Sequence, residues 1–144
     1  MLKNIPNILT PDLMKILMEM GHGDELVLAD GNFPCFGHPR RVTRCDGRGI
    51  PELLEAIMKF MPLDQYEAHS VILMQVLPDD PYVPEIWDAY RKIISKYEKG
   101  GARETAIHKA EFYARASKAY ALVTTSESAL YANIIIKKGV IVDN

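Results

Sequence analysis

The sequence predicts a single α/β domain over residues 1–144, with a largely parallel sheet flanked by helices. Three observations support this prediction. Segments with apolar residues at helical spacing alternate along the chain with short apolar runs, which is the order that places helices against a parallel sheet. The apolar runs are continuous, as in strands that are covered on both faces. A chain of 144 residues can bury one full core but is too short for two ordinary domains.

The N-terminal part of the chain is predicted to contain one helix and two strands. Thr-Pro-Asp at 10–12 combines an N-cap hydroxyl, a proline that fits the first helical position and an acidic residue in the first turn. Apolar residues follow at helical spacing until Gly21 ends the helix. The apolar run at 26–29 indicates a buried strand, and 40–45 indicates a second, more exposed strand.

The rest of the chain continues this alternation. A proline opens the helical pattern PELLEAIMKFM, which Pro62 ends, and SVILMQVL at 70–77 indicates a buried strand before a proline-rich loop. The later elements are expected in this order: a helix at 85–97 ended by Gly100-Gly101, a short strand at 104–107, a helix at 109–119, a buried strand at 120–125, and a final strand at 133–142 interrupted at Gly139.

Composition argues against several partners. The formal net charge of -2 gives no basic excess for binding phosphates, so no nucleic acid partner is expected. The first residues contain no unbroken apolar stretch, so neither a signal peptide nor a membrane span is expected there. Two cysteines are too few for a disulfide framework, and we expect free thiols in a cytoplasmic protein.

Two motifs that suggest cofactors do not meet their requirements. Gly-Arg-Gly at 47–49 precedes a helix, as a phosphate loop would, but Glu52 replaces the third glycine of a dinucleotide fingerprint and would repel a pyrophosphate. Cys35, His38 and Cys45 lack the paired spacing of metal ligands and a fourth donor. We therefore expect no metal, nucleotide or other cofactor.

The stretch MGHGDELVLADGNFP, residues 20–34, places a histidine and an aspartate at opposite ends of one strand. Asp30 follows the strand at 26–29, at the edge where open α/β sheets usually bind ligands. His22 precedes that strand and belongs to the other edge, roughly 15 Å away. Either the turn folds back along the sheet, or a second chain supplies one of the two groups.

Both residues have a functional and a plain interpretation. The end of a helix favours the imidazolium form of His22, which can donate or accept a proton near neutral pH. Alternatively, the ring is bonded to a carbonyl in the turn. Asp30 can orient a hydroxyl-rich ligand or accept a proton, or it can form the turn together with the Asn32 side chain. The residues alone leave these alternatives open.

Four motifs in order carry a resemblance to a known family: MGHGDELVLADGNFP, DGRGIPELLEAIMKFMPLDQY, AEFYARASKAYALVTTSE and ALYANIIIKKGV. In these motifs the chain resembles the L-fucose mutarotase branch of the family that also contains D-ribose pyranase. The resemblance implies an α/β subunit of a ring-shaped oligomer, a decamer of two stacked pentamers. It also implies cofactor-free interconversion of the α and β anomers of L-fucose or a related monosaccharide.

The resemblance also implies roles for individual residues. His22 is similar to the family's catalytic histidine, and Tyr113 to a residue that contacts the sugar or assists proton transfer. The positions that resemble sugar-binding residues are Asp30, Asp64, Tyr131 and Asn133. The resemblance further implies that the segment 131–133 of one subunit completes the pocket that holds His22 of its neighbour.

Two motifs depart from the fucose branch. Tyr-Ala-Asn at 131–133 stands where that branch commonly has Tyr-Gly-Asn, and Thr-Ser-Glu at 125–127 stands where it has Thr-Gly-Glu. Tyr-Ala-Asn is found in the ribose branch. Two alternatives therefore remain open, a D-ribose pyranase and a monosaccharide-binding module without turnover.

Overall fold

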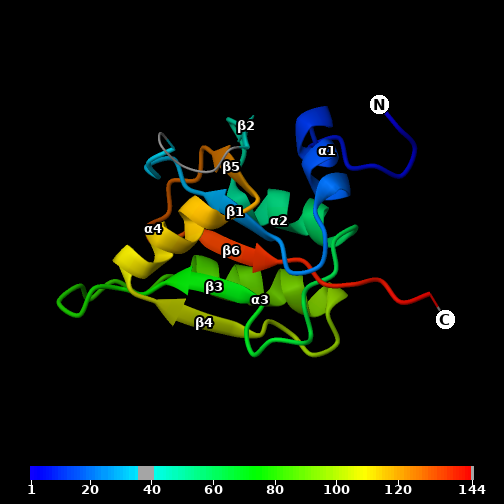
Figure 1. Cartoon of the computed structure of the whole chain (residues 1–144). Helices are drawn as coiled ribbons and strands as arrows, with labels where there is room; N and C mark the ends of the chain where they lie inside the picture. The colour runs from blue at the N-terminus through cyan, green and yellow to red at the C-terminus, as the bar shows by residue number, and fades with distance from the viewer. Residues whose placement is uncertain (36–40, 144) are drawn as a thin grey trace.

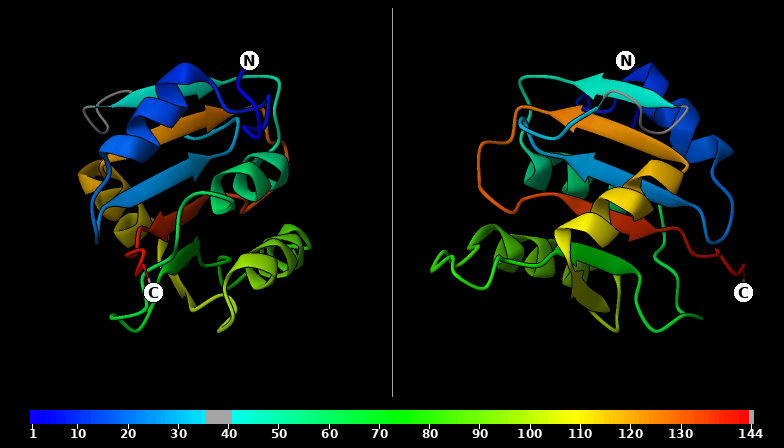
Figure 2. Two further views of the ribbon diagram at one scale, coloured as in Figure 1. Left: turned by 90° about the vertical axis from the view of Figure 1, so that its right-hand side faces the viewer. Right: turned by 60° about the vertical axis from the view of Figure 1, so that its left-hand side comes forward.

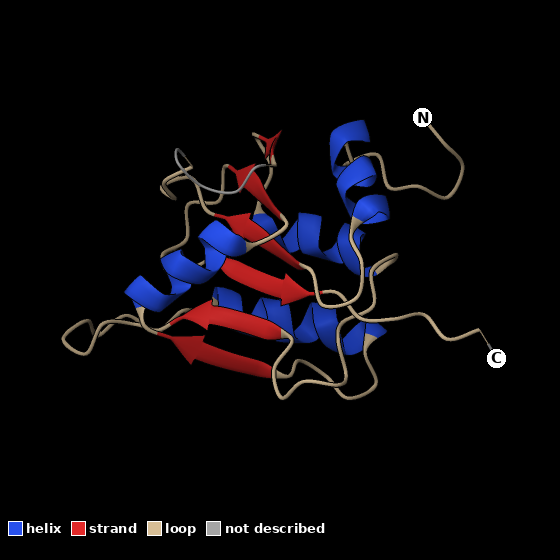
Figure 3. Cartoon of the chain, in the orientation of Figure 1, coloured by secondary structure: helices blue, strands red, loops and turns tan. Residues whose placement is uncertain are grey.

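The computed structural model of the chain describes residues 1–35 and 41–143. Within these ranges the chain forms four helices and a six-stranded sheet (Figures 1 and 3). The helices are α1 (Pro11–Glu19), α2 (Ile50–Met58), α3 (Ile86–Tyr97) and α4 (Lys109–Lys118). The strands are β1 (Glu25–Ala29), β2 (Val42–Cys45), β3 (Val71–Met74), β4 (Glu104–Ile107), β5 (Ala121–Thr125) and β6 (Ile134–Lys137).

The strands lie in the order β2-β5-β1-β6-β3-β4. The pairs β2·β5, β5·β1 and β3·β4 are parallel, whereas β6 is antiparallel to both of its neighbours, β1 and β3. All described strands except β6 therefore run in one direction, which confirms the prediction of an α/β fold with a largely parallel sheet. Because β6 runs in the opposite direction, its first residues lie near the C-terminal ends of β1 and β3, and its last residues lie near their N-terminal ends.

Helices cover both faces of the sheet. In Figure 1, α4 lies in front of the sheet while α2 and α3 lie behind it, and the turned views of Figure 2 agree. Side chains of α1, α2 and α3 share one apolar cluster with alternate residues of β1 and β6, and Phe112 and Ala116 of α4 belong to a second cluster on the other face. The central strands are fully buried for this reason, which explains their continuous apolar runs.

The predicted elements occur in order, with differences at their ends. Thr10 is the N-cap of α1, and its Oγ1 accepts a hydrogen bond from Leu13 N at 3.1 Å. The strand expected at 70–77 is confined to Val71–Met74, because the chain turns into the proline-rich loop. The helix expected at 85–97 spans Ile86–Tyr97, and Glu98 beyond it adopts an extended conformation. Residue 40, the start of the predicted second strand, lies outside the described residues.

The final strand ends at Lys137 and does not resume after Gly139, contrary to the expectation from its sequence. A Cβ atom at Gly139 would lie only 2.4 Å from the Leu63 carbonyl oxygen. The backbone at this position is therefore pressed against residues 63–64 and leaves the sheet there.

The start of α2 illustrates why the glycine-rich loop is a poor phosphate site. Glu52 Oε1 accepts a hydrogen bond from Gly49 N at 3.0 Å, and Glu127 Oε2 accepts one from Ile50 N at 3.1 Å. These two carboxylates already accept hydrogen bonds from backbone amides that a phosphate would need. In the described ranges, none of the helices combines the length and apolar character needed to cross a membrane.

Candidate active site

His22 lies in the tight turn between α1 and β1. Gly23 takes a positive φ of 86°, which a glycine adopts readily, and its amide donates to Lys138 O at 2.8 Å. Gly21 N donates to Asp24 Oδ2 at 2.8 Å and closes the turn from the other side. The His22 side chain is 46% exposed, so the turn presents an accessible imidazole at the N-terminal end of β1.

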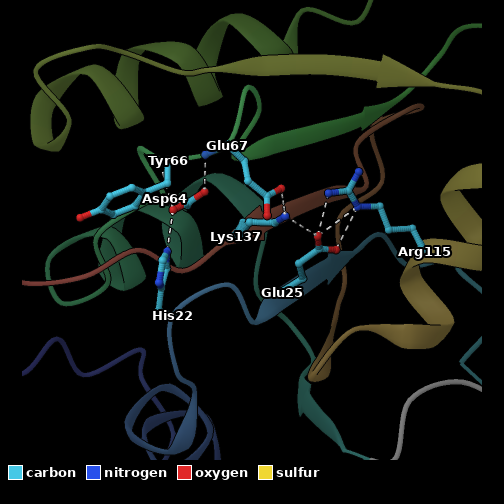
Figure 4. Close-up of polar contacts among 7 residues, drawn as sticks. All are labelled: His22, Glu25, Asp64, Tyr66, Glu67, Arg115 and Lys137. Carbon is cyan, nitrogen blue, oxygen red and sulfur yellow. Dashed lines mark hydrogen bonds and ion pairs between the residues drawn. The ribbon is translucent and has the colours of Figure 1, made fainter.

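The imidazole is held by Asp64, a residue 42 positions away in the sequence. His22 Nε2 lies 2.9 Å from Asp64 Oδ1, and the Tyr66 ring is tilted against the imidazole with 5.3 Å between the ring centroids (Figure 4). Asp64 is buried, and its carboxylate also accepts hydrogen bonds from Tyr66 N at 3.3 Å and Glu67 N at 3.0 Å. The plain interpretation of His22 predicted a bond from the ring to a carbonyl in the turn. In the structure the partner of the ring is the Asp64 carboxylate.

The environment of Asp64 keeps its carboxyl ionised. Burial alone would raise the pKa of Asp64, but the hydrogen bonds from Glu67, His22 and Tyr66 outweigh burial and place that pKa below its ordinary value. An ionised carboxylate only accepts hydrogen bonds, so His22 Nε2 carries the proton in this pair. The other ring nitrogen, Nδ1, is then the atom that can exchange a proton with a ligand.

Asp30 lies at the other end of β1, beside Asn133. Asp30 N donates to Asn133 Oδ1 at 2.7 Å, and Asn133 Nδ2 donates to Asp30 Oδ2 at 3.0 Å. Asp30 Oδ1 accepts from Asn32 N at 3.0 Å, so the turn is formed with the Asn32 backbone rather than with its side chain. Burial raises the pKa of Asp30, partly offset by these hydrogen bonds, and the charge of Glu127 adds to the rise.

A cavity of about 250 Å³ opens at this end of the sheet. Asp30, Asn133, Tyr113 and Tyr131 all line it, together with Asn32, Phe33, Met74, Gln75, Leu77, Asp80, Lys109 and Leu130. The Tyr113 ring stands edge-on to Phe33, with 5.3 Å between the ring centroids. Aromatic rings, amides and two carboxylates in one hollow are suited to a small ligand that has both hydroxyls and an apolar face.

Tyr131 is fixed in an uncommon backbone conformation. Its backbone φ is 56°, a value that residues other than glycine rarely adopt. Its hydroxyl donates to Asp80 Oδ2 at 2.6 Å, and its carbonyl accepts from Trp87 Nε1 at 2.8 Å. The Tyr82 ring is stacked on it, with 5.9 Å between the centroids. The hydrogen bond to Asp80 raises the pKa of Tyr131, so this hydroxyl stays protonated.

The residues singled out in the sequence therefore fall into two groups within one chain. The first group, His22 and Asp64, lies at the N-terminal end of β1. The second group, Asp30, Tyr113, Tyr131 and Asn133, lines the cavity at its C-terminal end. The turn does not fold back along the sheet, and one strand of roughly 15 Å separates His22 from Asp30. A single chain therefore does not bring His22 and Asp30 together by folding the turn back along the sheet, which was the first of the two arrangements left open by the sequence.

Several residues of the two groups were missed by sequence reasoning. Asp80 and Lys109 belong to the second group, and their signal was their position: each follows a strand whose carboxyl end lies at the same edge as Asp30. Glu67 and Lys137, which contact one another beside Asp64, gave no signal, because a charged residue in a turn or at the end of a strand usually lies in solvent.

A larger hollow of about 720 Å³ lies beside α4 and is lined by Glu25, Arg41, Arg115 and Tyr120 among others. Its arginines already have partners: Arg115 binds the Glu25 carboxylate, and Arg41 lies 4.2 Å from the centre of the Tyr120 ring. We regard the smaller cavity as the better ligand site, because its polar groups converge on one hollow lined by aromatic rings.

No group of three or more His, Cys, Asp or Glu side chains suited to a metal ion occurs in residues 1–35 and 41–143. Cys35 and Cys45 are free thiols. His38, the third residue weighed as a metal ligand, lies outside the described residues.

Comparison with known proteins identifies the family. Residues 3–141 match the RbsD / FucU transport protein family, and the chain belongs to this family. The fucose mutarotase of Danio rerio is 49% identical over 148 residues, which cover 97% of this chain and 94% of that protein. The L-fucose mutarotase of Actinobacillus pleuropneumoniae is 44% identical over 140 residues and 97% of both chains. The resemblance seen in the four motifs is thereby confirmed.

Solved structures agree with this assignment. The fucose mutarotase of Streptococcus pneumoniae, solved in complex with L-fucose, is 49% identical, and its structure matches with a TM-score of 0.92 over 98% of this chain and 100% of that chain. RbsD of Bacillus subtilis, solved with D-ribose, is 22% identical and matches with a TM-score of 0.74 over 99% of this chain and 100% of that chain. The second similarity is one of fold alone.

Proposed function

We propose that this chain is a cofactor-free fucose mutarotase, an isomerase that interconverts the α and β anomers of L-fucose or a related monosaccharide, with residues 1–144 as one mutarotase domain. One observation carries the proposal: a buried carboxylate, Asp64, holds the accessible imidazole of His22. The relatives named fucose mutarotases, similar over nearly the full length, support it. A held imidazole is a group that can move a proton at neutral pH.

The reaction needs two proton transfers and no change in oxidation state. The anomeric hydroxyl loses a proton, the ring oxygen gains one, and the bond between C1 and the ring oxygen breaks to leave an open-chain aldehyde. Closure on the other face of the aldehyde gives the other anomer. One acid and one base suffice, and a positioned group of this kind contributes roughly 10²–10⁴-fold to the rate.

We assign the proton transfers to His22 and Tyr113. Because Nε2 of His22 is engaged by Asp64, Nδ1 takes up and returns the proton. Tyr113 lines the same cavity as Asp30 and Asn133, where its hydroxyl can exchange a proton with a bound sugar. Asp64 was also predicted to contact the sugar, but its burial and its three donors favour action through His22.

We assign sugar binding to Asp30, Asn133 and Tyr131. The carboxylate of Asp30 and the amide of Asn133 can hold sugar hydroxyls in a fixed pose, and the Tyr131 ring can cover an apolar face of the sugar. The mutual hydrogen bonds of Asp30 and Asn133 hold both side chains in place before the ligand arrives.

The separation of the two groups supports a shared site. Since His22 and Asp30 lie at opposite ends of one strand, we propose that each site combines the first group of one chain with the second group of a neighbour, in a ring-shaped decamer of two stacked pentamers.

The free thiols Cys35 and Cys45 support a reducing compartment and hence a cytoplasmic location.

The function is tested by saturation transfer between anomer signals in NMR spectra of L-fucose, D-ribose and D-galactose. We expect transfer between the L-fucose anomers at protein concentrations far below the sugar concentration. Broadened lines without transfer would instead identify a binding module. Faster exchange of D-ribose between its pyranose and furanose forms would favour the pyranase alternative, which the Tyr-Ala-Asn motif at 131–133 keeps open.

A further inference from the structure

The end of β6 joins the two segments that carry His22 and Asp64. On one side, Lys138 N donates to Asp24 O and Gly23 N donates to Lys138 O, both at 2.8 Å. On the other side, Asp64 N donates to Lys137 O at 3.0 Å and Gly139 N to Pro62 O at 2.8 Å. The segment 137–139 therefore lies between the turn of His22 and the segment of Asp64.

The side chain of Lys137 lies inside this arrangement. The residue is only 7% exposed, which is rare for a lysine unless it is paired. Its ammonium group contacts the Glu67 carboxylate and lies 3.5 Å from Glu25 Oε1. Figure 4 shows Lys137 between Asp64 and Glu67 on one side and Glu25 and Arg115 on the other.

Glu25 is itself fixed on both sides. It faces Lys137 across the antiparallel pair of β1 and β6, a position where opposite charges stabilise pairing. The Arg115 guanidinium donates two hydrogen bonds to its carboxylate, from Nη2 at 2.7 Å and from Nε at 3.0 Å. The two positive charges of Lys137 and Arg115 thus match the two negative charges of Glu25 and Glu67, so the buried ammonium group is compensated.

Glu67 links this network to Asp64. Its side chain binds Lys137, while its backbone amide donates to Asp64 Oδ2. The remaining oxygen, Oδ1, accepts from Tyr66 N and His22 Nε2. A displacement of Glu67 would therefore change the orientation of the carboxylate that holds the imidazole.

We propose that Lys137 is a positioning residue for the His22–Asp64 pair, acting through the Glu67 carboxylate and the turn 64–67. The inference rests on the proposed function only where it concerns catalysis, since the placement of the imidazole can be measured without turnover. Without the ammonium group, the Glu67 side chain would lose the contact that fixes the turn 64–67, and its backbone amide would hold Asp64 less firmly.

Two variants break the same contact from opposite sides. Lys137→Met removes the charge and keeps the length of the side chain. Glu67→Gln keeps the backbone donor to Asp64 and changes a side chain that is 64% exposed, so the fold tolerates it even if Lys137→Met folds poorly. The matched control is Lys96→Met, which removes an ion pair to Glu55 of 3.0 Å on the surface.

The readouts are the ring-proton NMR signals of His22 and the kinetics of L-fucose anomer exchange. We expect Lys137→Met and Glu67→Gln to move the His22 signals toward their position in Asp64→Asn. We also expect kcat to fall roughly tenfold with little change in KM, because about 1.4 kcal/mol of lost positioning corresponds to this factor. Lys96→Met should match the wild type in both measurements.

The combination of variants separates positioning from overall stability. If Lys137 acts through Glu67, the double variant with both Lys137→Met and Glu67→Gln lowers kcat by less than the product of the two single effects. Unmoved His22 signals in both variants, or a fully multiplicative double variant, would overturn the proposal. If the wild type shows no exchange of fucose anomers, the proposed function fails, while the His22 signals still decide the role of Lys137.

Discussion

One aspartate lies near each end of β1, and the two aspartates have opposite environments. At the N-terminal end, Asp64 accepts bonds from an imidazole and two backbone amides, and its pKa falls despite burial. At the C-terminal end, Asp30 is bonded to Asn133 and Asn32, but burial and the charge of Glu127 raise its pKa. The first carboxylate is suited to stay ionised beside a histidine. The second can bind hydroxyls and take up a proton more readily than an ordinary aspartate.

The largest effect is expected at the N-terminal end. His22→Ala should reduce the rate of anomer exchange by roughly 10²–10⁴-fold, the contribution of a positioned acid or base. The half-exposed ring contributes little packing, so folding should be preserved. Saturation transfer measures the rate and circular dichroism the fold, with the exposed His69 replaced by alanine as control. A variant with near wild-type exchange would remove His22 from the mechanism.

Asp30→Asn tests the C-terminal end. We expect a rise in KM of at least tenfold with a smaller change in kcat, because a hydrogen bond to a charged group contributes about 1.5–3 kcal/mol. The matched control is Asp143→Asn, an exposed aspartate far along the sequence. A variant that loses kcat while KM is unchanged would instead place Asp30 in proton transfer.

Asp80→Asn tests how Tyr131 is held. The neutral amide still accepts a bond from the hydroxyl, so we expect KM to rise only about fivefold, near 1 kcal/mol of binding energy. Asp79→Asn, the exposed neighbour in the same loop, should leave KM unchanged. Equal effects of the two variants would show that the charge of the loop, rather than the contact between Asp80 and Tyr131, determines binding.

The smallest effect is on stability, and it distinguishes the two carboxyls by sign. The lowered pKa of Asp64 means that its stabilisation is present above pH about 4 and is lost as pH falls further. The raised pKa of Asp30 means that the folded chain binds its proton first, so the wild type gains relative to Asp30→Asn as pH falls toward 4.

Thermal unfolding between pH 3 and 8 measures both differences. The advantage of the wild type over Asp64→Asn should shrink on acidification, while its stability relative to Asp30→Asn should increase. Parallel trends for the two variants would contradict the assignment of opposite environments.

The sequence predicted one end of β1 better than the other. A short apolar run followed by Asp30 placed that carboxylate at the ligand-binding edge of an α/β sheet, because strand direction alone determines the edge. The partner of His22 was not predictable from spacing, since 42 residues separate it from Asp64. The two meet because antiparallel β6 ends between their segments. Lys137 gave no sign of burial, because its pairing depends on Glu25 across the strand and on Glu67 in a distant turn.

The shared site is the central claim, and complementation between two inactive variants tests it most directly. His22→Ala and Asn133→Ala are unfolded and refolded together, and light scattering verifies that mixed oligomers form. If each site combines His22 of one chain with Asn133 of a neighbour, random assembly restores about a quarter of the sites, and anomer exchange returns on mixing. If each site is built within one chain, every chain of the mixture stays defective, and exchange that does not exceed the sum of the separate variants would contradict the account.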